Sequence, residues 1–186
     1  MEYRLKITES HKHFISFYIK INVSELSSLT LQLPAWRPGR YELGNFAKNI
    51  RNFKVVNENE EFLVFKKTSK DSWIIDNIEK ENFVFVEYQY YANSLNAGST
   101  LLNEHQLYIN PVNCFIYNPN KSNEEFFVYL DVPKSYKTVT SLSLNDNGYY
   151  NAISFDELAD SPIISSETIQ QKTLNFSGID FHFCFQ

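Results

Sequence analysis

Regular alternation of apolar and polar side chains is the feature that most constrains the fold of this chain. Its clearest run covers residues 14–23, where every second residue is apolar: Ile15, Phe17, Ile19, Ile21 and Val23. Successive side chains of a β-strand point to opposite faces, so a period of two places these five on one face. The run therefore predicts a strand with one buried face.

Similar runs recur along the chain and predict a fold built from sheets. They lie at residues 3–8, 29–33, 53–56, 62–66, 73–75, 83–91, 126–131, 174–176 and 179–185. Segments 53–56 and 62–66 are expected to form a hairpin, and the nearly continuous apolarity of 83–91 predicts a central strand buried on both faces. Sixteen Phe and twelve Tyr against one Met also favour sheet over helix. We expect an all-β fold of curved, mostly antiparallel sheets, of sandwich or saddle type, with one or two short helical turns.

Length and charge narrow the classes of function. The 186 residues contain no repeat or linker and are expected to form a single β domain over 1–186. A net charge of -5 argues against a nucleic-acid partner. No apolar run approaches the length of a membrane span and no signal peptide opens the chain, which leaves a cytoplasmic or, after signal removal, a periplasmic location open. Because the chain stops directly after a predicted strand, we expect a domain cut from a longer polypeptide.

The stretch 33–50 is unlike the alternating runs around it. It holds two of the six Pro, two of the five Gly and one of the two Trp. Pro38-Gly39 predicts the centre of a type II turn, and Trp36 is expected to bury its ring and brace that turn. The candidate site residues of this loop are Trp36, Arg37, Arg40 and Tyr41, although a buried turn with a solvated arginine pair is the better explanation of them.

A second candidate site lies near residue 160. Ser154-x-x-Glu157 has the form of a capping box, which predicts a helical turn over 155–159 that Pro162 stops. Three carboxylates fall within five residues, and they could face a substrate amine or a cation or simply belong to the capped turn. They are Asp156, Glu157 and Asp160.

Common catalytic motifs do not occur in the sequence. None of the four His residues is followed by Glu-x-x-His, and there is no Gly-x-Ser-x-Gly elbow, P-loop or Gly-x-Gly-x-x-Gly. His11 and His13 share one strand face but have no third ligand placed by the sequence, so a solvated bend is the better interpretation. We expect no catalytic residue and no metal site in this chain.

Two segments carry a resemblance to a known family. Leu33-Pro34-x-Trp36-x-Pro38-Gly39, with Tyr41 and the following Asn-Phe-Ala-Lys-Asn-Ile of residues 45–50, resembles the opening domain of the glycyl aminopeptidases. These are family sixty-one of the metallopeptidases, zinc enzymes of the gluzincin clan. The segment 155–163, Phe-Asp-Glu-Leu-Ala-Asp-Ser-Pro-Ile, is a second match.

The resemblance implies a role as the N-terminal domain of a zinc aminopeptidase. The zinc and the general base would belong to a following catalytic domain with His-Glu-x-x-His, which this chain does not contain. The β domain would pack on that domain, wall one side of the cleft and help to orient the amino end of a peptide substrate. The family often has Glu two residues after its Asp-Ser-Pro, whereas this chain has Ile164, which argues against amine recognition by that residue.

A rival interpretation is a free-standing β-sandwich that binds carbohydrate or protein through its many aromatic side chains. An exposed row of coplanar aromatics would favour this rival, while one flat apolar patch near the C-terminus would favour docking to another domain. If the two candidate segments line one cleft, they should share an edge of the sheets. Arg37 or Arg40 should then lie within salt-bridge reach of Asp156, Glu157 or Asp160.

Overall fold

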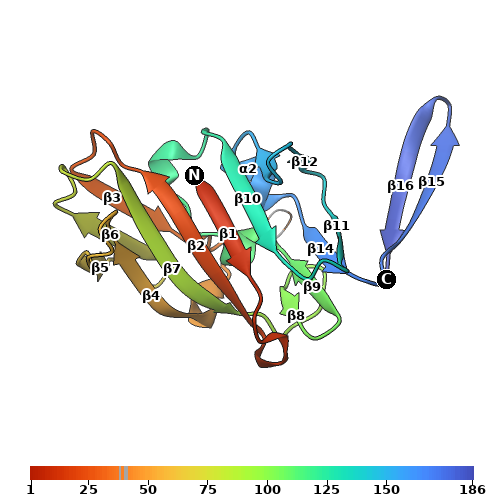
Figure 1. Ribbon diagram of the computed structural model, residues 1–186, viewed down its shortest axis with the longest axis horizontal. Coiled ribbons are helices and arrows are strands. Elements are labelled where there is room, and N and C mark those ends of the chain that lie inside the picture. The colour runs from red at the N-terminus through yellow and green to blue at the C-terminus, as the bar shows by residue number, and fades with distance from the viewer. Residues whose placement is uncertain (38, 40–41) are drawn as a thin grey trace.

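A seven-stranded sheet in the order β12-β13-β10-β1-β2-β7-β4 forms the front of the molecule (Figure 1). The computed structural model describes residues 1–37, 39 and 42–186. Strand β1 pairs with β10 in parallel, and every other strand pair within these residues is antiparallel. The strands of the large sheet are β1 (Glu2–Lys6), β2 (Phe14–Asn22), β4 (Ile50–Val56), β7 (Phe83–Tyr91), β10 (Phe126–Asp131), β12 (Ser143–Leu144) and β13 (Tyr150–Ala152).

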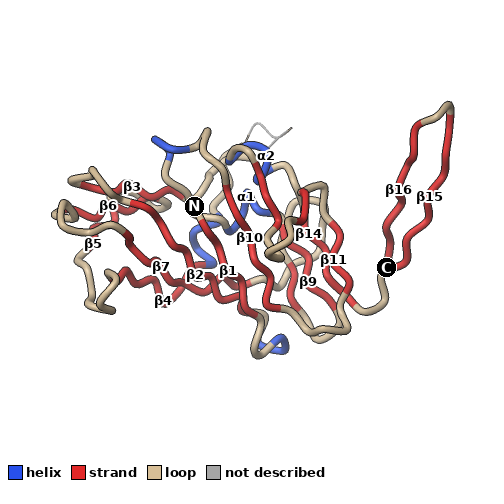
Figure 2. The backbone as a smooth tube through the Cα atoms, turned by 45° about the horizontal axis from the view of Figure 1, so that its top comes forward, coloured by secondary structure: helices blue, strands red, loops and turns tan. Residues whose placement is uncertain are grey.

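Two smaller sheets lie toward opposite ends of the large one (Figures 1 and 2). At one end the order is β3-β6-β5, and at the other it is β11-β14-β9-β8. Their strands are β3 (Ser28–Gln32), β5 (Phe65–Lys67), β6 (Ser72–Asp76), β8 (Leu101–Leu102), β9 (Gln106–Ile109), β11 (Lys137–Val139) and β14 (Ile163–Ser166).

The helical segments are all short, which confirms the predicted all-β class. The turn expected at 155–159 is present as α2. None of the helices in the described part of the chain is long and apolar enough to span a membrane. The helical segments are η1 (Ser10–Lys12), η2 (Phe46–Asn49), α1 (Pro111–Cys114), η3 (Pro119–Lys121) and α2 (Phe155–Ala159).

The core lies behind the large sheet, on the face that the alternating residues share. All five apolar residues of the run 15–23 are buried there. Two buried tyrosines tie the segment after α1 to this face, because the Tyr3 hydroxyl donates to the Ile116 carbonyl (2.9 Å) and the Tyr88 hydroxyl to the Cys114 carbonyl (2.5 Å). Burying these hydroxyls is tolerable because each has a partner.

Two details differ from the sequence-based predictions. Strand β7 has a neighbour on each side, β2 and β4, but it lies next to the edge of the sheet and not at its centre. It also buries only alternate residues, so the prediction of burial on both faces was wrong. The expected hairpin of 53–56 with 62–66 is formed only next to its turn, where Val56 bridges to Phe62 and the Leu63 amide donates to the Val55 carbonyl (2.9 Å). Beyond the turn, β4 pairs with β7 and β5 with β6.

The last two strands, β15 (Gln170–Phe176) and β16 (Ile179–Phe185), form a hairpin that projects away from the other sheets (Figures 1 and 2). Every residue of these strands is exposed except Cys184, which is partly exposed. Cross-strand partners share a face, and the register puts six large apolar side chains on one face. They are Leu174, Phe176, Ile179, Phe181, Phe183 and Phe185, which we call the hairpin apolar face.

Candidate functional site

The loop that carries the first candidate residues is closed by a hydrogen bond at its neck. Strand β3 leads into it, and the Gly44 amide donates to the Ala35 carbonyl (2.8 Å). Gly39 has φ of +73°, as expected for glycine in the third position of a type II turn. Trp36 lies beyond the neck and is 39% exposed, so the prediction that its ring is mostly buried was wrong.

Arg37 points into a neighbouring loop. Its guanidinium Nη1 donates to the Gly98 carbonyl oxygen, and a Cβ at Gly98 would overlap the guanidinium. Glycine at this position therefore lets the arginine pack against the loop backbone. Arg40, Tyr41 and Pro38 lie outside the described residues.

The second candidate segment forms the predicted capped turn. The Ser154 Oγ accepts from the Glu157 amide (3.2 Å), and the Glu157 Oε2 accepts from the Ile153 amide (2.7 Å). Asp156 and Asp160 are exposed, and Asp160 ends the helix with its amide donating to the Asp156 carbonyl (3.0 Å). Glu157 thus has a structural partner, whereas the carboxylates of the two aspartates face solvent.

Tyr117 connects the two segments. Its backbone exchanges hydrogen bonds with Gln32, at the end of β3 (2.8 and 2.9 Å), and its ring stacks on Phe155 of α2 with centroids 3.7 Å apart. Burial and the nearby Asp156 carboxylate both raise the pKa of Tyr117. Segments more than a hundred residues apart are therefore anchored to the same stretch of chain.

The predicted ion pair is not made by Arg37. Among the described residues no ion pair joins Arg37 to Asp156, Glu157 or Asp160, because the guanidinium is committed to the Gly98 carbonyl. The assignment of these side chains to the edge of a substrate cleft stays a prediction.

A polar hollow of about 330 Å³ lies next to the Gly98 loop and collects segments that the sequence left unconnected. Residues 45–49, from the family-like motif, form one part of its lining; the end of β7 and the loop 93–100 form another, and Asn113 of α1 completes it. We call it the Asn113 hollow. The sequence analysis singled out only residues 45–49 of this lining, through the family-like motif.

Asn113 is the unusual member of this lining. Its side chain is buried, and its Nδ2 donates to the Gly98 carbonyl (2.9 Å), the oxygen that Arg37 also contacts. Its Oδ1 has no hydrogen-bond partner, and no other buried side-chain nitrogen or oxygen in the described residues shares that state.

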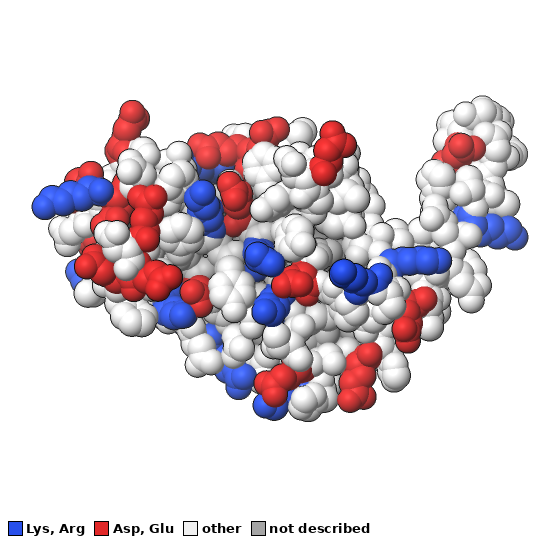
Figure 3. All heavy atoms as spheres, in the orientation of Figure 1, with Lys and Arg blue, Asp and Glu red and all other residues white. Residues whose placement is uncertain are grey.

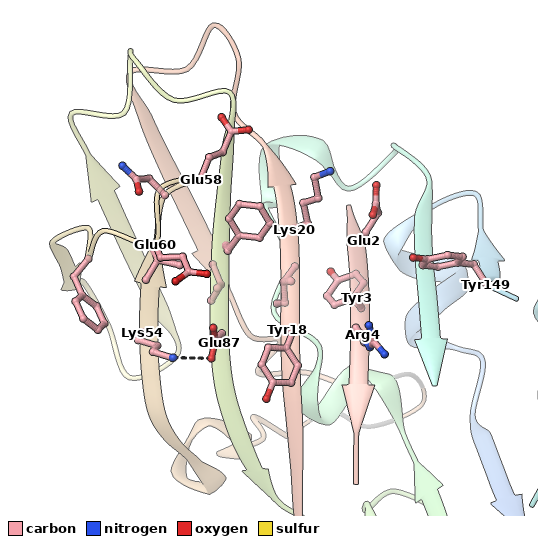
Figure 4. Close-up of a pocket in the computed structure, with 16 residues that line it drawn as sticks. Glu2, Tyr3, Arg4, Tyr18, Lys20, Lys54, Glu58, Glu60, Glu87 and Tyr149 are labelled. Atoms are coloured by element: carbon pink, nitrogen blue, oxygen red, sulfur yellow. Dashed lines mark ion pairs between the residues drawn. The ribbon is translucent and has the colours of Figure 1, made fainter. Parts of the chain in front are cut away.

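A depression of about 740 Å³ forms a groove on the outer face of the seven-stranded sheet (Figure 4). Its cations have partners within the domain: Lys54 pairs with Glu87 (2.8 Å), Arg4 pairs with Asp131 (3.4 Å), and Lys20 lies over the Phe83 ring. The carboxylates of Glu2, Glu58 and Glu60 also line the groove. The groove presents mixed charges and no grouped nucleophile and base.

The described residues also lack a ligand set for zinc. No three His, Cys, Asp or Glu side chains come together in that part of the chain. The two cysteines are free thiols, and burial raises the pKa of Cys114. The residues present therefore do not fit a zinc site.

Comparison with known families identifies the domain. The family model described as the Peptidase M61 N-terminal domain matches residues 2–167, most of the chain. The chain belongs to this family. The M61 N-terminal domain thus ends, by this match, just before the projecting hairpin.

A solved structure shares this fold. An aminopeptidase N family protein from Idiomarina loihiensis has a TM-score of 0.89 at 22% identity, over 98% of this chain and 32% of that one. An M1 zinc metallopeptidase mutant from Deinococcus radiodurans, bound to a Tyr-Ser-Ala substrate, has a TM-score of 0.49 at 11% identity, over 98% of this chain and 45% of that one. This chain therefore spans about a third to a half of the length of these proteins. No curated protein matches the sequence.

Proposed function

We propose that this M61 N-terminal domain is the non-catalytic β domain of a zinc aminopeptidase, which packs on the catalytic domain and walls one side of its substrate cleft. Family membership supports the placement in such a peptidase. The match to a chain about three times as long supports the presence of a further domain.

The hairpin apolar face carries the proposal. An isolated two-stranded hairpin is at best marginally stable in water, and here six large apolar side chains lie on one solvent-exposed face. The space-filling view shows few charges on this projection (Figure 3). Because Leu174 and Ile179 interrupt the phenylalanines, the face is a mixed apolar patch near the C-terminus. Such a patch suits a protein surface better than a sugar ring, which favours docking over the rival binding module.

Zinc chemistry would come from the partner domain. The residues described here supply no zinc ligands, so the zinc and the general base would lie on the catalytic domain. This β domain would help to orient the substrate, which would be a peptide bound by its amino end. The loop of Trp36 and Arg37 and the exposed carboxylates near Asp160 would form part of the cleft edge.

Hydrogen exchange of the hairpin tests the docking. In the longer polypeptide that includes the catalytic domain, the amides of β16 should exchange at least about tenfold more slowly than in the 186-residue chain, because packing adds local stability. Replacing Phe181 and Phe183 by serine should remove the protection. Thr173→Ala and His182→Ala, on the opposite face, are the matched control. Equally fast exchange in the two polypeptides would contradict docking.

Kinetics of Asp160→Asn in the same longer polypeptide test the cleft edge. We expect a higher KM with turnover retained, because the carboxylate would act on substrate placement rather than bond breaking. Asp146→Asn, in an exposed turn, is the control. An unchanged KM would leave Asp160 outside the cleft.

A further inference from the structure

The outer groove is the depression of about 740 Å³ on the exposed face of the seven-stranded sheet (Figure 4). Strands β1, β2, β4 and β7 form its floor, the loop 57–62 lies at one end, and Tyr149 lies at the other. Its volume is within the range of about 300–1,000 Å³ that is typical of ligand sites. The hairpin projects from the opposite end of the molecule (Figure 1), so the outer groove is separate from the hairpin apolar face.

The loop 57–62 is held in one conformation by Asn57, a buried polar residue. Its Nδ2 donates to the carboxylates of Glu61 (2.9 Å) and Glu81 (3.3 Å), and its Oδ1 accepts from two backbone amides of the same loop (3.0 Å each). With all these groups paired, the side chain braces the loop from inside. The loop therefore presents its other carboxylates to the groove from a fixed backbone.

The groove carries unmatched negative charge. Two of its three cations are paired with carboxylates, and the third, Lys20, lies over the Phe83 ring, 4.2 Å from its centroid. Within the described residues no ion pair includes Glu2, Glu58 or Glu60, although Glu2 lies directly opposite Lys20 in the strand register. All three carboxylates are exposed. A cationic ligand would complement this surface, whereas an anionic ligand would have to displace existing partners.

The carboxylates are spread along the groove and are not grouped. Glu2 lies on β1, whereas Glu58 and Glu60 follow β4, three strand spacings or about 14 Å away. In the described part of the chain, no three acidic, His or Cys side chains come together to hold a metal ion. An extended peptide covers about 14 Å in about four residues. The spacing therefore suits a peptide with separated cationic side chains better than a metal ion.

Aromatic side chains in the lining provide apolar surface for such a peptide. Tyr18 and Phe62 are exposed, and Phe85 and Tyr149 are partly exposed. Lysine and arginine have an apolar stem below a charged head, and both heads bind aromatic faces. A basic side chain can therefore use the rings and the carboxylates of the groove at the same time.

We propose that the outer groove binds an extended basic segment of a partner polypeptide. Its lysine or arginine heads pair with the carboxylates of Glu2, Glu58 and Glu60, and their stems pack on Tyr18 and Phe62. This site lies outside the candidate cleft edge and the hairpin, so it does not rest on the proposed function.

Three capped peptides that differ only in charge test the proposal. We would titrate the ¹⁵N-labelled 186-residue chain with acetyl-Lys-Thr-Ser-Thr-Lys-amide and with its glutamine and glutamate counterparts. The lysine peptide should shift the backbone signals of residues 57–62 and bind at least about tenfold more tightly than the glutamine peptide, and the glutamate peptide should bind least. The affinity should fall between about 10 and 150 mM salt, as the Debye length shortens from about 30 to about 8 Å. Equal binding of the lysine and glutamine peptides, or shifts only outside the groove, would overturn the proposal.

Charge-neutralising substitutions locate the binding. Glu58→Gln with Glu60→Gln should weaken the lysine peptide by about tenfold or more, the equivalent of about 1.4 kcal/mol. Glu104→Gln with Glu167→Gln is the matched control, because it removes the same charge from exposed positions outside the groove and should bind as the parent does. Parent-like binding by the groove variant, or equal weakening in the control, would exclude this site.

Phe62→Ser tests the aromatic contact with little risk to the fold, since Phe62 is 76% exposed. It should weaken the lysine peptide by about threefold or more, and an unchanged affinity would refute packing on this ring. These titrations need no catalytic domain and leave the hairpin unaltered. A failure here therefore leaves the hairpin exchange result intact, and a failure of docking leaves the peptide titration intact.

Discussion

The two tryptophans should contribute differently to the free energy of unfolding, because one is buried and the other is exposed. Trp73 is 3% exposed and stacks on Phe53 with centroids 4.8 Å apart, which joins the β3-β6-β5 sheet to the large one. Trp36 stands beyond the neck of its loop and is 39% exposed. We therefore expect Trp73→Ala to lower the free energy of unfolding by about 3 kcal/mol or more and Trp36→Ala by about 1 kcal/mol or less. Denaturant unfolding measures both, and equal losses would contradict these different roles.

Buried tyrosines make stability depend on alkaline pH. Burial raises the pKa of Tyr88 well above its usual value of 10.0. Below about pH 10, Tyr88 is therefore protonated in both the folded and the unfolded protein. Above pH 10 the tyrosine ionises in the unfolded protein but keeps its proton in the folded one, so the free energy of unfolding falls as the pH rises. Tyr88→Phe should reduce this loss by about 1.4 kcal/mol per pH unit above pH 10. Unfolding at pH 8 provides the reference, and an unchanged alkaline slope would contradict the expected effect.

At the scale of elements, α2 depends on its caps. Ser154 and Glu157 satisfy amides at the start of this five-residue helix. Ser154→Ala should cost about 1 kcal/mol, because an amide of the first turn loses its partner. Asp160→Asn, at the exposed end, should stay within about 0.5 kcal/mol of the parent. Thermal unfolding of the two variants measures both costs, and a loss of about 1 kcal/mol or more for Asp160→Asn would give Asp160 a structural role.

The sequence predicted where the strands and helical turns lie better than it predicted which strands pair with each other. Strands such as β2 were predictable because every second residue is apolar, and this spacing identifies the buried face. The capped turn α2 was predictable for a similarly local reason. The pairing of β5 with β6 and the Asn113 hollow depend on contacts between distant segments, and no local pattern encodes these.

At the scale of the whole molecule, the hairpin and the remaining sheets should behave as separate units. The family match ends at residue 167, and β15 and β16 pair with each other and with no other strand of the described structure. Residues 1–169 alone should therefore keep the melting temperature of the full chain within about 3 °C, since little buried surface is lost. They should also aggregate less, because the hairpin apolar face is gone. A large fall in melting temperature would show that the hairpin stabilises the other sheets.

The parallel pairing of β1 with β10 also bears on how the protein is made. Leu5 lies opposite Leu130, so during synthesis β1 waits for a neighbour that is made 125 residues later. At about 5–20 residues per second, the β10-facing edge of β1 stays open for roughly 6–25 s. Throughout that time the nascent chain carries an unpaired edge of Tyr3 and Leu5, a template for pairing with another chain. A chaperone that binds β1 while β10 is still unmade should therefore raise the yield of soluble protein more than one added after release.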